Sequence, residues 1–438
     1  MRKLTVVAVL LSLLLGVANC VAFAAPKPVE ITFWYMGWGV NYESVIKDII
    51  SDFEAEYPNI KVRAEVVPWQ AGWYEKFLTA VTGRVAPDIS EGASYQPILF
   101  AAMNEILPVD DIIAELERDG RVADLASQNH KNYYMDGHYW AVPIQTDPRL
   151  MAYRKDFIDE AGMGVPSTWD EFLAVAKKLT TDFDGDGRVD RYGFAYPAGR
   201  GHQPMQTLLT FMLQNGAYTL DENGTLAFGS EKTVEALRFL TDLTLKHKVT
   251  PPGILDYAEY ADVDQLVYDG KAAMVYTTDN FFFNAMNDDL PVLDQLAVLP
   301  PLKGPEGHTG LAGFTNPIMI YKQTKHPEEA KTFLRFYLRP ENLGRLYACG
   351  DFHWPAEKQF FALERYQQSE PIRDIANKVL PVTHDYTYPS DATPIIPVIE
   401  GELMWADAVQ LVLAGRMSVE EAVSFITGKM EEAVELNQ

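Results

Sequence analysis

The feature that most constrains this chain is an alternation of strand-like and helix-like hydrophobic patterns along most of its length. Residues 29–35 alternate apolar and polar side chains, as a strand with two different faces does. Residues 46–57 then carry apolar side chains at helical spacing, and a second alternating stretch follows at 60–66. This β-α-β order predicts an α/β fold with mainly parallel sheets and flanking helices.

The same alternation continues through the rest of the chain. Capping boxes at 168–171 and 418–421 precede apolar stripes that predict helices. Further helices are predicted at 230–246 and 327–337, and strands at 272–276 and 317–321. The 438 residues are about three times the usual length of one domain, and no repeat or low-complexity linker divides them. We therefore expect two lobes joined by several short crossings.

The N-terminus has the pattern of a targeting segment. A basic pair precedes the apolar run 4–17, and residues 22–24 give the small-x-small pattern of a signal peptidase site. This predicts a signal peptide over 1–24 and an exported protein in the periplasm or another extracytoplasmic place. A membrane anchor is disfavoured because the run is shorter than the ~20 residues that a span needs. Lipid anchoring at Cys20 is also disfavoured, since Asn19 stands where lipoprotein signals have a small residue.

Charge and composition narrow the class of function. The chain has 61 Asp and Glu against 37 Lys and Arg, a net charge of −24, which would repel phosphate backbones. Nucleic acid is therefore excluded as a partner. Aromatic residues make up 12% of the chain and provide flat apolar faces that can stack on a ligand. Neither a nucleophile elbow, a zinc-protease motif nor a phosphate-binding loop is present, so we expect no enzyme.

Six segments of the chain carry motifs in a fixed order. They are the ITFWYMGWG run with the EYPNIKVRAEVVPWQ stretch after it, YWAVPIQTDPRLMAYR, PSTWDEFLAVAKKLT, DGKAAMVYTTDN, HPEEAKTFLRFYLRPE and AGRMSVEEAV. Their order resembles that of family 1 extracellular solute-binding proteins, the sugar receptors of ABC importers, which are similar to maltose-binding protein. The resemblance implies the two-lobe periplasmic-binding-protein fold, with a hinge that lets the lobes close around one solute. It also implies a sugar or oligosaccharide ligand, an ABC permease in the membrane as partner, and a monomer.

The resemblance also implies how the lobes divide the chain. The expected parts are the first part of the N-terminal lobe at 25–144, the first part of the C-terminal lobe at 145–276, a return segment of the N-terminal lobe at 277–340 and a helical end of the C-terminal lobe at 341–438.

Candidate ligand-binding residues of the first lobe follow the ends of predicted strands, where open α/β sheets bind ligands. Trp38 and Asn41 lie at a Gly-containing turn after the first strand, and Trp69 follows the second. Exposed indoles are costly unless they are used, so Trp38 is the preferred stacking face, while Trp69 is equally compatible with packing. The resemblance adds Tyr95 and Gln96, whose loop reaches the sugar in relatives.

Other candidates lie at the crossing to the second lobe and beyond it. Gln145 and Asp147 can accept hydrogen bonds from sugar hydroxyls, although Asp147 can equally pair with Arg149. The resemblance places the remaining candidates in loops that face the cleft in relatives: Arg200, Asp279, Asn280, Phe281, Phe314 and Trp354. Relatives commonly carry a stacking Trp where this chain has Asn280, and the Phe run that begins at Phe281 is also typical of core packing.

One motif suggests a metal ion. Asp182, Asp184, Asp186 and Asp190 place carboxylates in the order D-x-D-x-D-G-x-x-D, which resembles the first nine positions of an EF-hand loop. The twelfth position is Gly193 in place of the usual bidentate Glu. A structural calcium ion and a solvated turn are both compatible with this pattern.

The sequence thus predicts an extracytoplasmic receptor that captures a sugar in an interlobe cleft and delivers it to an ABC permease. Two alternatives stay open at this stage. Abundant carboxylates and aromatics also suit a secreted glycan hydrolase. A receptor of the same fold for a non-sugar solute, such as a polyamine or an oxyanion, is the other alternative, though oxyanions call for convergent Arg side chains.

Overall fold

The computed structural model describes residues 27–436 except 70–71, 94, 127 and 352–353. The signal peptide predicted at 1–24, and with it Cys20, therefore lies outside the described residues. Within them, no helix is both long enough and apolar enough to cross a membrane.

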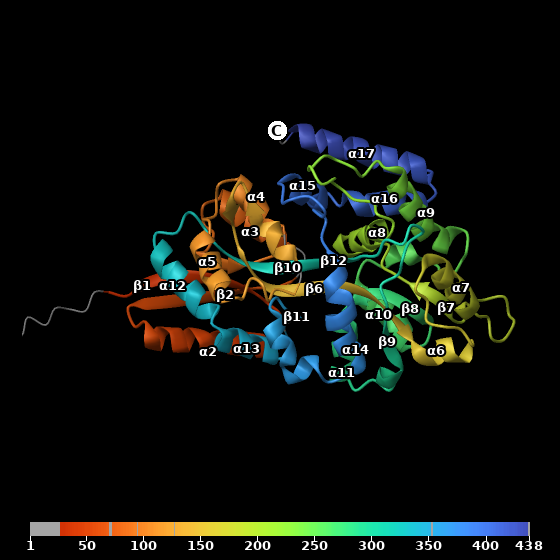
Figure 1. Cartoon of the computed structure of the whole chain (residues 1–438), viewed down its shortest axis with the longest axis horizontal. Coiled ribbons are helices and arrows are strands. Elements are labelled where there is room, and N and C mark those ends of the chain that lie inside the picture. The colour runs from red at the N-terminus through yellow and green to blue at the C-terminus, as the bar shows by residue number, and fades with distance from the viewer. Residues whose placement is uncertain (1–26, 70–71, 94, 127, 352–353, 437–438) are drawn as a thin grey trace, which may run out of the picture.

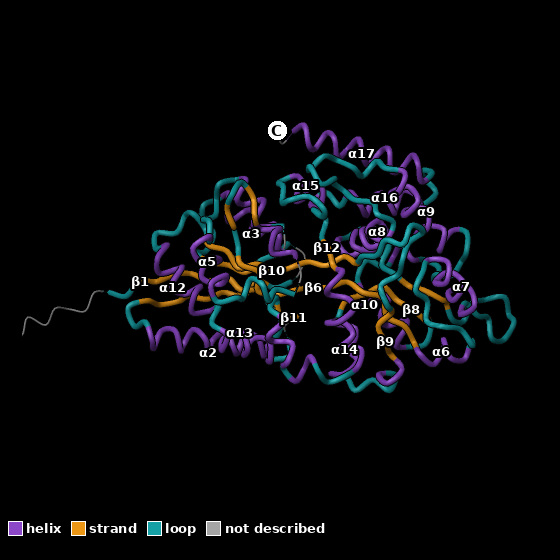
Figure 2. Tube along the Cα trace, in the orientation of Figure 1, coloured by secondary structure: helices purple, strands orange, loops and turns teal. Residues whose placement is uncertain are grey.

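One mixed sheet runs through the length of the molecule, with helices on both sides (Figures 1 and 2). Its strands follow the order β2 (Ile60–Val67), β1 (Val29–Met36), β3 (Ile89–Glu91), β10 (Leu311–Ile320), β6 (Val142–Arg154), β8 (Ala272–Thr278) and β7 (Tyr192–Ala195). Three short strands extend it: β9 (Leu296–Leu299) and β11 (Trp354–Pro355) pair with β6, and β12 (Thr383–His384) pairs with β10. A separate hairpin joins β4 (Tyr134–Met135) to β5 (His138–Tyr139).

The two long strands β6 and β10 connect the lobes. At one end β10 pairs with β3, and at the other end β6 pairs with β8. The pairs β1–β2, β1–β3 and β7–β8 are parallel, whereas β3–β10, β10–β6 and β6–β8 are antiparallel. The predicted two-lobe α/β fold is confirmed, with parallel strands inside each lobe and antiparallel strands where the chain crosses.

Helices of the first lobe cover β1 to β3. They are α2 (Val40–Glu56), α3 (Trp73–Thr82), α4 (Gln96–Ala102), α5 (Asp110–Arg118), α12 (Pro327–Tyr337) and α13 (Pro340–Ala348). The helix predicted from residue 46 begins at Val40, because the Asp351 carboxylate accepts the backbone N–H groups of Asn41 (2.7 Å) and Tyr42 (3.0 Å). This distant cap places Asn41 in the first turn of a helix instead of a loop.

Helices of the second lobe surround β7 and β8. They are α6 (Lys155–Glu160), α7 (Trp169–Leu179), α8 (His202–Gln214), α9 (Glu231–Leu245), α10 (Tyr260–Tyr268), α11 (Asn280–Asn287), α14 (Glu370–Asp374), α15 (Ile395–Gly401), α16 (Met404–Leu413) and α17 (Val419–Leu436). The predicted capping residues are in place, since the Thr168 side chain accepts Glu171 N–H and the Ser418 side chain accepts Glu421 N–H.

The residue boundaries predicted for the lobes stay predictions. Within the predicted return segment 277–340, β9 pairs with Met151–Arg154 at the second-lobe end of β6, and the chain runs back to the first lobe along β10. Within the predicted C-terminal segment 341–438, α13 packs against α2 of the first lobe.

Candidate functional site

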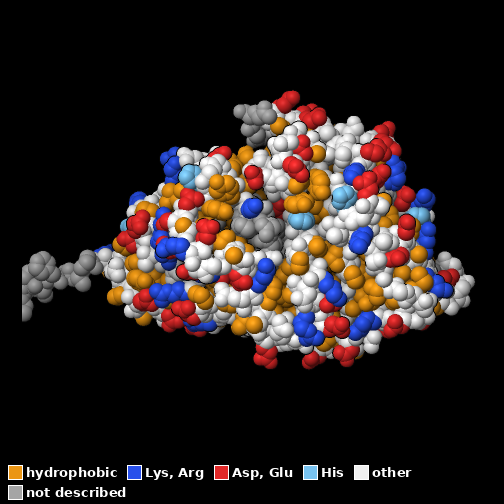
Figure 3. All heavy atoms as spheres, in the orientation of Figure 1, with side chains coloured by type: hydrophobic (Ala, Val, Ile, Leu, Met, Phe, Trp, Pro, Cys, Tyr) orange, Lys and Arg blue, Asp and Glu red, His pale blue; other side chains and the backbone are white. Residues whose placement is uncertain are grey.

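Helix α4 of the first lobe lies beside α15 of the second lobe (Figure 1). A pocket lies between these parts of the two lobes. Acidic and basic side chains are interspersed with hydrophobic ones over the face of the molecule in Figure 3. The pocket lining comes from both lobes, and it consists of Tyr95, Ile98, Asn132, Asp385, Tyr386, Thr387, Thr393, Ile396, Pro397 and Glu400. A solute held here would therefore contact both halves of the molecule.

The first-lobe side of this region is a chain of aromatic rings. The ring of Tyr95 lies 5.7 Å from that of Tyr74, measured between centroids. Tyr74 contacts Trp73, and Trp69 lies between Trp73 (4.8 Å) and Trp38 (5.0 Å). Trp69 is 37% exposed, which is unusual for so large an apolar ring. This aromatic chain offers faces that can stack on the C–H patches of a sugar.

A buried carboxylate holds the Trp38 end of the aromatic chain in place. Glu91, at the end of β3, accepts hydrogen bonds from the backbone N–H of Met36 (2.9 Å) and from Trp38 Nε1 (3.4 Å). Its other oxygen accepts the hydroxyl groups of Tyr42 and Tyr337, the latter at 2.8 Å. Burial raises the pKa of Glu91, while these four donors act against the rise. Glu91 thus fixes the position of the turn that carries Trp38.

The second-lobe wall of the pocket contains buried polar atoms without partners. Glu400 is 4% exposed, and its Oε2 has no hydrogen-bond partner among the described residues. The same holds there for the hydroxyl group of Tyr386 and for Trp405 Nε1, whose rings stack with centroids 4.3 Å apart. Buried polar atoms in folded proteins are nearly always hydrogen-bonded, so unpaired ones beside a pocket indicate a place for a ligand.

The electrostatics of this wall are dominated by two carboxyl groups. Burial raises the pKa of Asp385 to about 6, against hydrogen bonds from Thr387 that lower it. Burial, with Asp385 adding to it, raises the pKa of Glu400 well above its ordinary value, and Arg149 opposes that rise. Arg149 is itself paired, with Nη1 2.5 Å from Asp147 Oδ1 and Nη2 3.0 Å from Asp147 Oδ2. Its charge is therefore matched before any ligand arrives.

The ligand-binding residues predicted for the first lobe and for the crossing fall into two groups in the structure. Tyr95 lines the pocket, and Trp38 and Trp69 lie side by side in the aromatic chain. The remaining ones each have a partner within the fold, although Gln96 Nε2 and Gln145 Nε2 are buried without a hydrogen-bond partner among the described residues. Asn41 Nδ2 donates to Asp351 Oδ1 (3.2 Å), buried Gln96 Oε1 accepts Ala93 N–H (2.9 Å), buried Gln145 Oε1 accepts from Asn316, and Asp147 pairs with Arg149.

The predicted second-lobe residues lie mostly away from the pocket. Phe314 contacts the pocket wall, because its ring packs against Tyr386 with centroids 5.3 Å apart. Arg200 is exposed and pairs with Asp407 (2.7 Å), and Asn280 is exposed at the start of α11 next to buried Asp279. Phe281 and Trp354 are fully buried: the Phe281 ring stacks on Tyr268, and the Trp354 ring packs at a tilt against Tyr366. Both rings thus pack in the core, although Trp354 Nε1 has no hydrogen-bond partner among the described residues.

The sequence analysis missed the residues of the second-lobe wall. Asp385 and Tyr386 follow β12 in a segment rich in aromatic and acidic residues, 384–388, which resembles the strand-end loops singled out in the first lobe. Glu400 lies in the short helix IIPVIEG, whose other residues are mostly apolar. An acidic residue in an apolar helix predicts a buried charge, and that signal could have found it.

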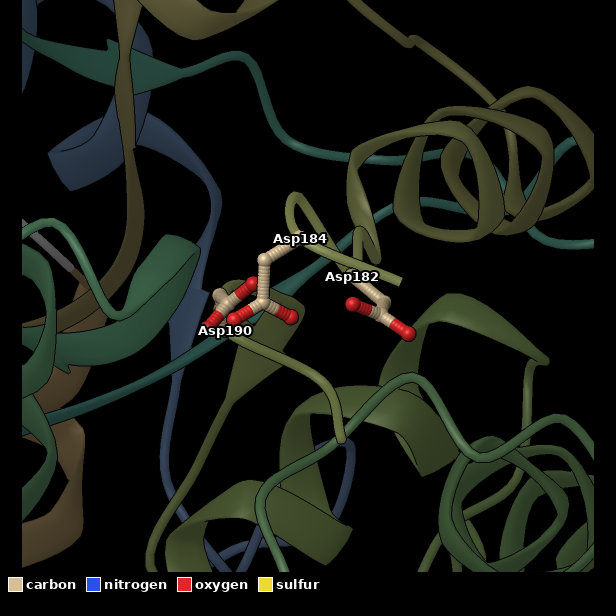
Figure 4. Close-up of side chains that lie close together, drawn as sticks. All are labelled: Asp182, Asp184 and Asp190. Atoms are coloured by element: carbon tan, nitrogen blue, oxygen red, sulfur yellow. The ribbon is translucent and has the colours of Figure 1, made fainter. Parts of the chain in front are cut away.

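The Asp-rich loop between α7 and β7 brings three of its four predicted ligands together (Figure 4). Carboxylate oxygens of Asp182, Asp184 and Asp190 lie within 4.8 Å of one another, and Asp186 is not part of this group. The loop also uses these carboxylates internally, because Asp182 accepts the N–H groups of Gly185 (2.7 Å) and Gly187 (2.9 Å). The arrangement fits a cation in part, and calcium at this loop stays a prediction.

Comparison with known proteins agrees with this architecture. Residues 39–343 match the family described as bacterial extracellular solute-binding protein. The arabinooligosaccharide-binding protein of Halalkalibacterium halodurans is 26% identical over 318 residues, which cover 70% of this chain and 66% of that protein. Relatives from Brucella abortus and Escherichia coli are also named as putative binding proteins, in agreement with the prediction that this chain is not an enzyme.

Solved structures share the fold over nearly the whole chain. A sugar transporter protein from Arthrobacter chlorophenolicus A6 with bound laminaribiose has a TM-score of 0.78 at 24% identity, covering 92% of this chain and 99% of that one. Maltose-bound T. maritima MalE3 has a TM-score of 0.74 at 22% identity, with the same coverage of 92% and 99%. These similarities establish the two-lobe fold.

Proposed function

The chain belongs to the bacterial extracellular solute-binding protein family, and from this premise we propose that it captures a sugar or oligosaccharide between its lobes and delivers it to an ABC permease. The observation that carries the proposal is the interlobe pocket, which is lined by Tyr95 from the first lobe and by Glu400 and Tyr386 from the second. Glu400 Oε2 and the Tyr386 hydroxyl group have no hydrogen-bond partner among the described residues. The names of relatives support a sugar or polyol ligand, since they include proteins for arabinooligosaccharide and for erythritol.

The proposed mechanism is capture by closure of the lobes. Aromatic rings on the first-lobe side remove C–H faces of the sugar from water, and polar atoms on the second-lobe wall hydrogen-bond its hydroxyl groups. Because the ligand contacts both lobes only when they are closed, it shifts the population toward the closed state. The closed form then presents a surface made of both lobes to the permease.

Family membership implies an extracytoplasmic location. The finer features are proposals. We propose that the predicted signal peptide is removed, that the mature protein is free in the periplasm or an equivalent space, and that it acts as a monomer.

A ligand screen by thermal unfolding tests the proposed function. Neutral mono- and oligosaccharides are added to the purified mature chain, and a ligand at 100 times its Kd should stabilise the protein by about 2.7 kcal/mol. Calorimetry should then give reversible binding of one ligand per chain, with the sugar recovered intact. Release of a shorter sugar would support the hydrolase alternative, and a panel without any binding saccharide would contradict the proposal.

A further inference from the structure

The interlobe pocket is acidic. Of the described residues that line it, the two with charged side chains are Asp385 and Glu400. A third acid, Glu75 on α3, lies near enough to contribute, after burial, to the raised pKa of Tyr74 and of Tyr95. An acidic pocket lined by aromatic rings is suited to a ligand with positive charge.

Among the described residues, neither lining carboxylate is hydrogen-bonded to a cationic side chain. Asp385 is hydrogen-bonded by neutral donors, namely the N–H (2.9 Å) and hydroxyl (2.6 Å) groups of Thr387 and the amide of Asn132. Glu400 is 4% exposed, and its Oε2 has no hydrogen-bond partner within the described part of the chain. Burying a carboxylate without a counter-charge is costly, and a ligand that supplies one would recover that cost.

Neighbouring basic side chains do not fill this role. The charge of Arg149 lowers the pKa of Glu400, against the effect of burial, without a hydrogen bond between them. The Arg149 guanidinium donates instead to Asp147 and to Gln206 Oε1 (2.5 Å). His202 Nδ1 lies 3.9 Å from Glu400 Oε1, beyond hydrogen-bond distance. Burial also lowers the pKa of His202, with Glu75 opposing, so its ring is mostly neutral at about pH 7.

We infer that the ligand is an amino sugar, whose protonated amine is bound by Glu400 and Asp385 at the second-lobe wall of the pocket. The inference rests on the proposed function, because it names the class of sugar that the same pocket takes. A hydroxyl group would satisfy the free oxygen of Glu400 but would leave the two acids without a counter-charge. An ammonium group supplies three donors and a positive charge, and the rings of Tyr95 and Tyr386 add cation–π attraction.

Matched sugar pairs test the inference by calorimetry at pH 7. The pairs are D-glucosamine with D-glucose, D-galactosamine with D-galactose, and the β-1,4-linked glucosamine disaccharide with cellobiose. We expect the amine member of at least one pair to bind about tenfold tighter or more, as a charge-assisted hydrogen bond replaces a neutral one. N-acetylation of that sugar should abolish the preference, since the amide carries no charge.

Variants show whether the preference comes from these carboxylates. Glu400→Gln keeps the shape of the side chain and should bring the affinities within a pair to about threefold of each other or less. Asp385→Asn is a second variant with the same expectation, and Glu402→Gln, an exposed acid just beyond α15, is the matched control that should keep the preference. Circular dichroism and the melting temperature verify that each variant is folded.

The outcomes separate this inference from the proposed function. Neutral sugars that bind as tightly as their amine counterparts would overturn the inference and leave the sugar receptor intact. A preference that survives in both folded variants would overturn it as well. Binding of putrescine with no response to any saccharide would contradict the proposed function itself.

Discussion

Each lobe contains a nearly fully buried glutamate next to the aromatic or polar lining of the cleft, and the two have opposite surroundings. Glu91 in the first lobe is 1% exposed and accepts hydrogen bonds from four donors. Glu400 in the second lobe is 4% exposed, and one of its oxygens has no partner among the described residues. Equal burial thus accompanies two roles, and the hydrogen-bond inventory distinguishes them: Glu91 positions Trp38, whereas Glu400 is available to a ligand.

This comparison shows how the fold prepares a binding site. In the first lobe the buried carboxylate has a structural role. Glu91 connects the end of β1, α2 and α12 through hydrogen bonds from Met36, Tyr42 and Tyr337. The second lobe keeps a buried acid incompletely satisfied, which lowers the stability of the empty protein and leaves interaction energy for the ligand. Four measurements test this contrast.

Removal of Glu91 should give the largest effect. Glu91→Ala removes the acceptor of the Met36 N–H and of the Tyr42 and Tyr337 hydroxyl groups, of which the two hydroxyl groups can still pair with each other (2.9 Å), so we expect the free energy of unfolding to fall by about 3 kcal/mol. Urea denaturation followed by tryptophan fluorescence measures it. Glu30→Ala, at an exposed acid of β1 whose salt bridge to Arg63 is also exposed, is the control that should change little. If the Glu91→Ala variant were as stable as the wild type, the positioning role assigned to Glu91 would be wrong.

Neutralising Glu400 should raise the stability of the unliganded protein, whereas removal of Glu91 lowers it. Its pKa in the folded state is raised, so its contribution to stability is full below the unfolded value of 4.5 and is lost as pH rises above it. Glu400→Gln should therefore stabilise the unliganded protein by about 2 kcal/mol at pH 8 and by much less at pH 4.5. Melting temperatures at the two pH values measure the difference. A gain of equal size at both values would argue that packing, and not charge, is responsible.

The pH dependence of Asp385 tests the same contrast at the second carboxyl group of the pocket. Because burial raises the pKa of Asp385 to about 6, the stability of the empty protein should decline as pH rises from 3.8 to about 6. Asp385→Asn should make that decline shallower by about 2 kcal/mol over this window. The titratable groups Glu400, Tyr133 and Tyr386 face or adjoin this carboxyl group, and the tyrosines stay protonated throughout. Unfolding by urea at several pH values checks the slopes, and parallel slopes would contradict the assignment.

The sequence predicted the fold well, since strand and helix periodicity is local. The strand 272–276 and the helix 327–337 were found within a few residues, and the motif order gave the family. The start of α2 was placed too late because its cap, Asp351, comes from 310 residues away. Local patterns carry no information about a cap supplied by a distant segment.

The candidate site was predicted only in part, for a related reason. Trp38, Trp69 and Tyr95 follow strand ends, so their positions could be inferred from the chain order alone. Phe281 and Trp354 occupy similar positions in sequence, yet Tyr268 and Tyr366 cover their rings in the core. Glu400 enters the pocket because α15 packs against α4, a contact between segments about 300 residues apart. Whether a strand-end side chain is covered or open depends on such long-range packing.

The carboxylates of the Asp-rich loop are accessible to solvent, unlike Glu91 and Glu400. Changes to them should therefore have the smallest effect on stability. Asp184 and Asp190 are exposed and Asp182 is partly exposed, and backbone N–H groups donate to Asp182 and Asp190. Repulsion among the three carboxylates therefore costs little, and a cation gains little by relieving it. Millimolar Ca²⁺ should raise the melting temperature by the equivalent of about 0.5 kcal/mol, and a chelator should reverse it without changing sugar affinity. Asp184→Asn should abolish the shift, whereas Asp170→Asn, at an exposed acid in the first turn of α7, should keep it. An unchanged melting temperature with and without Ca²⁺ would leave the loop as a solvated turn, stabilised by its own backbone hydrogen bonds.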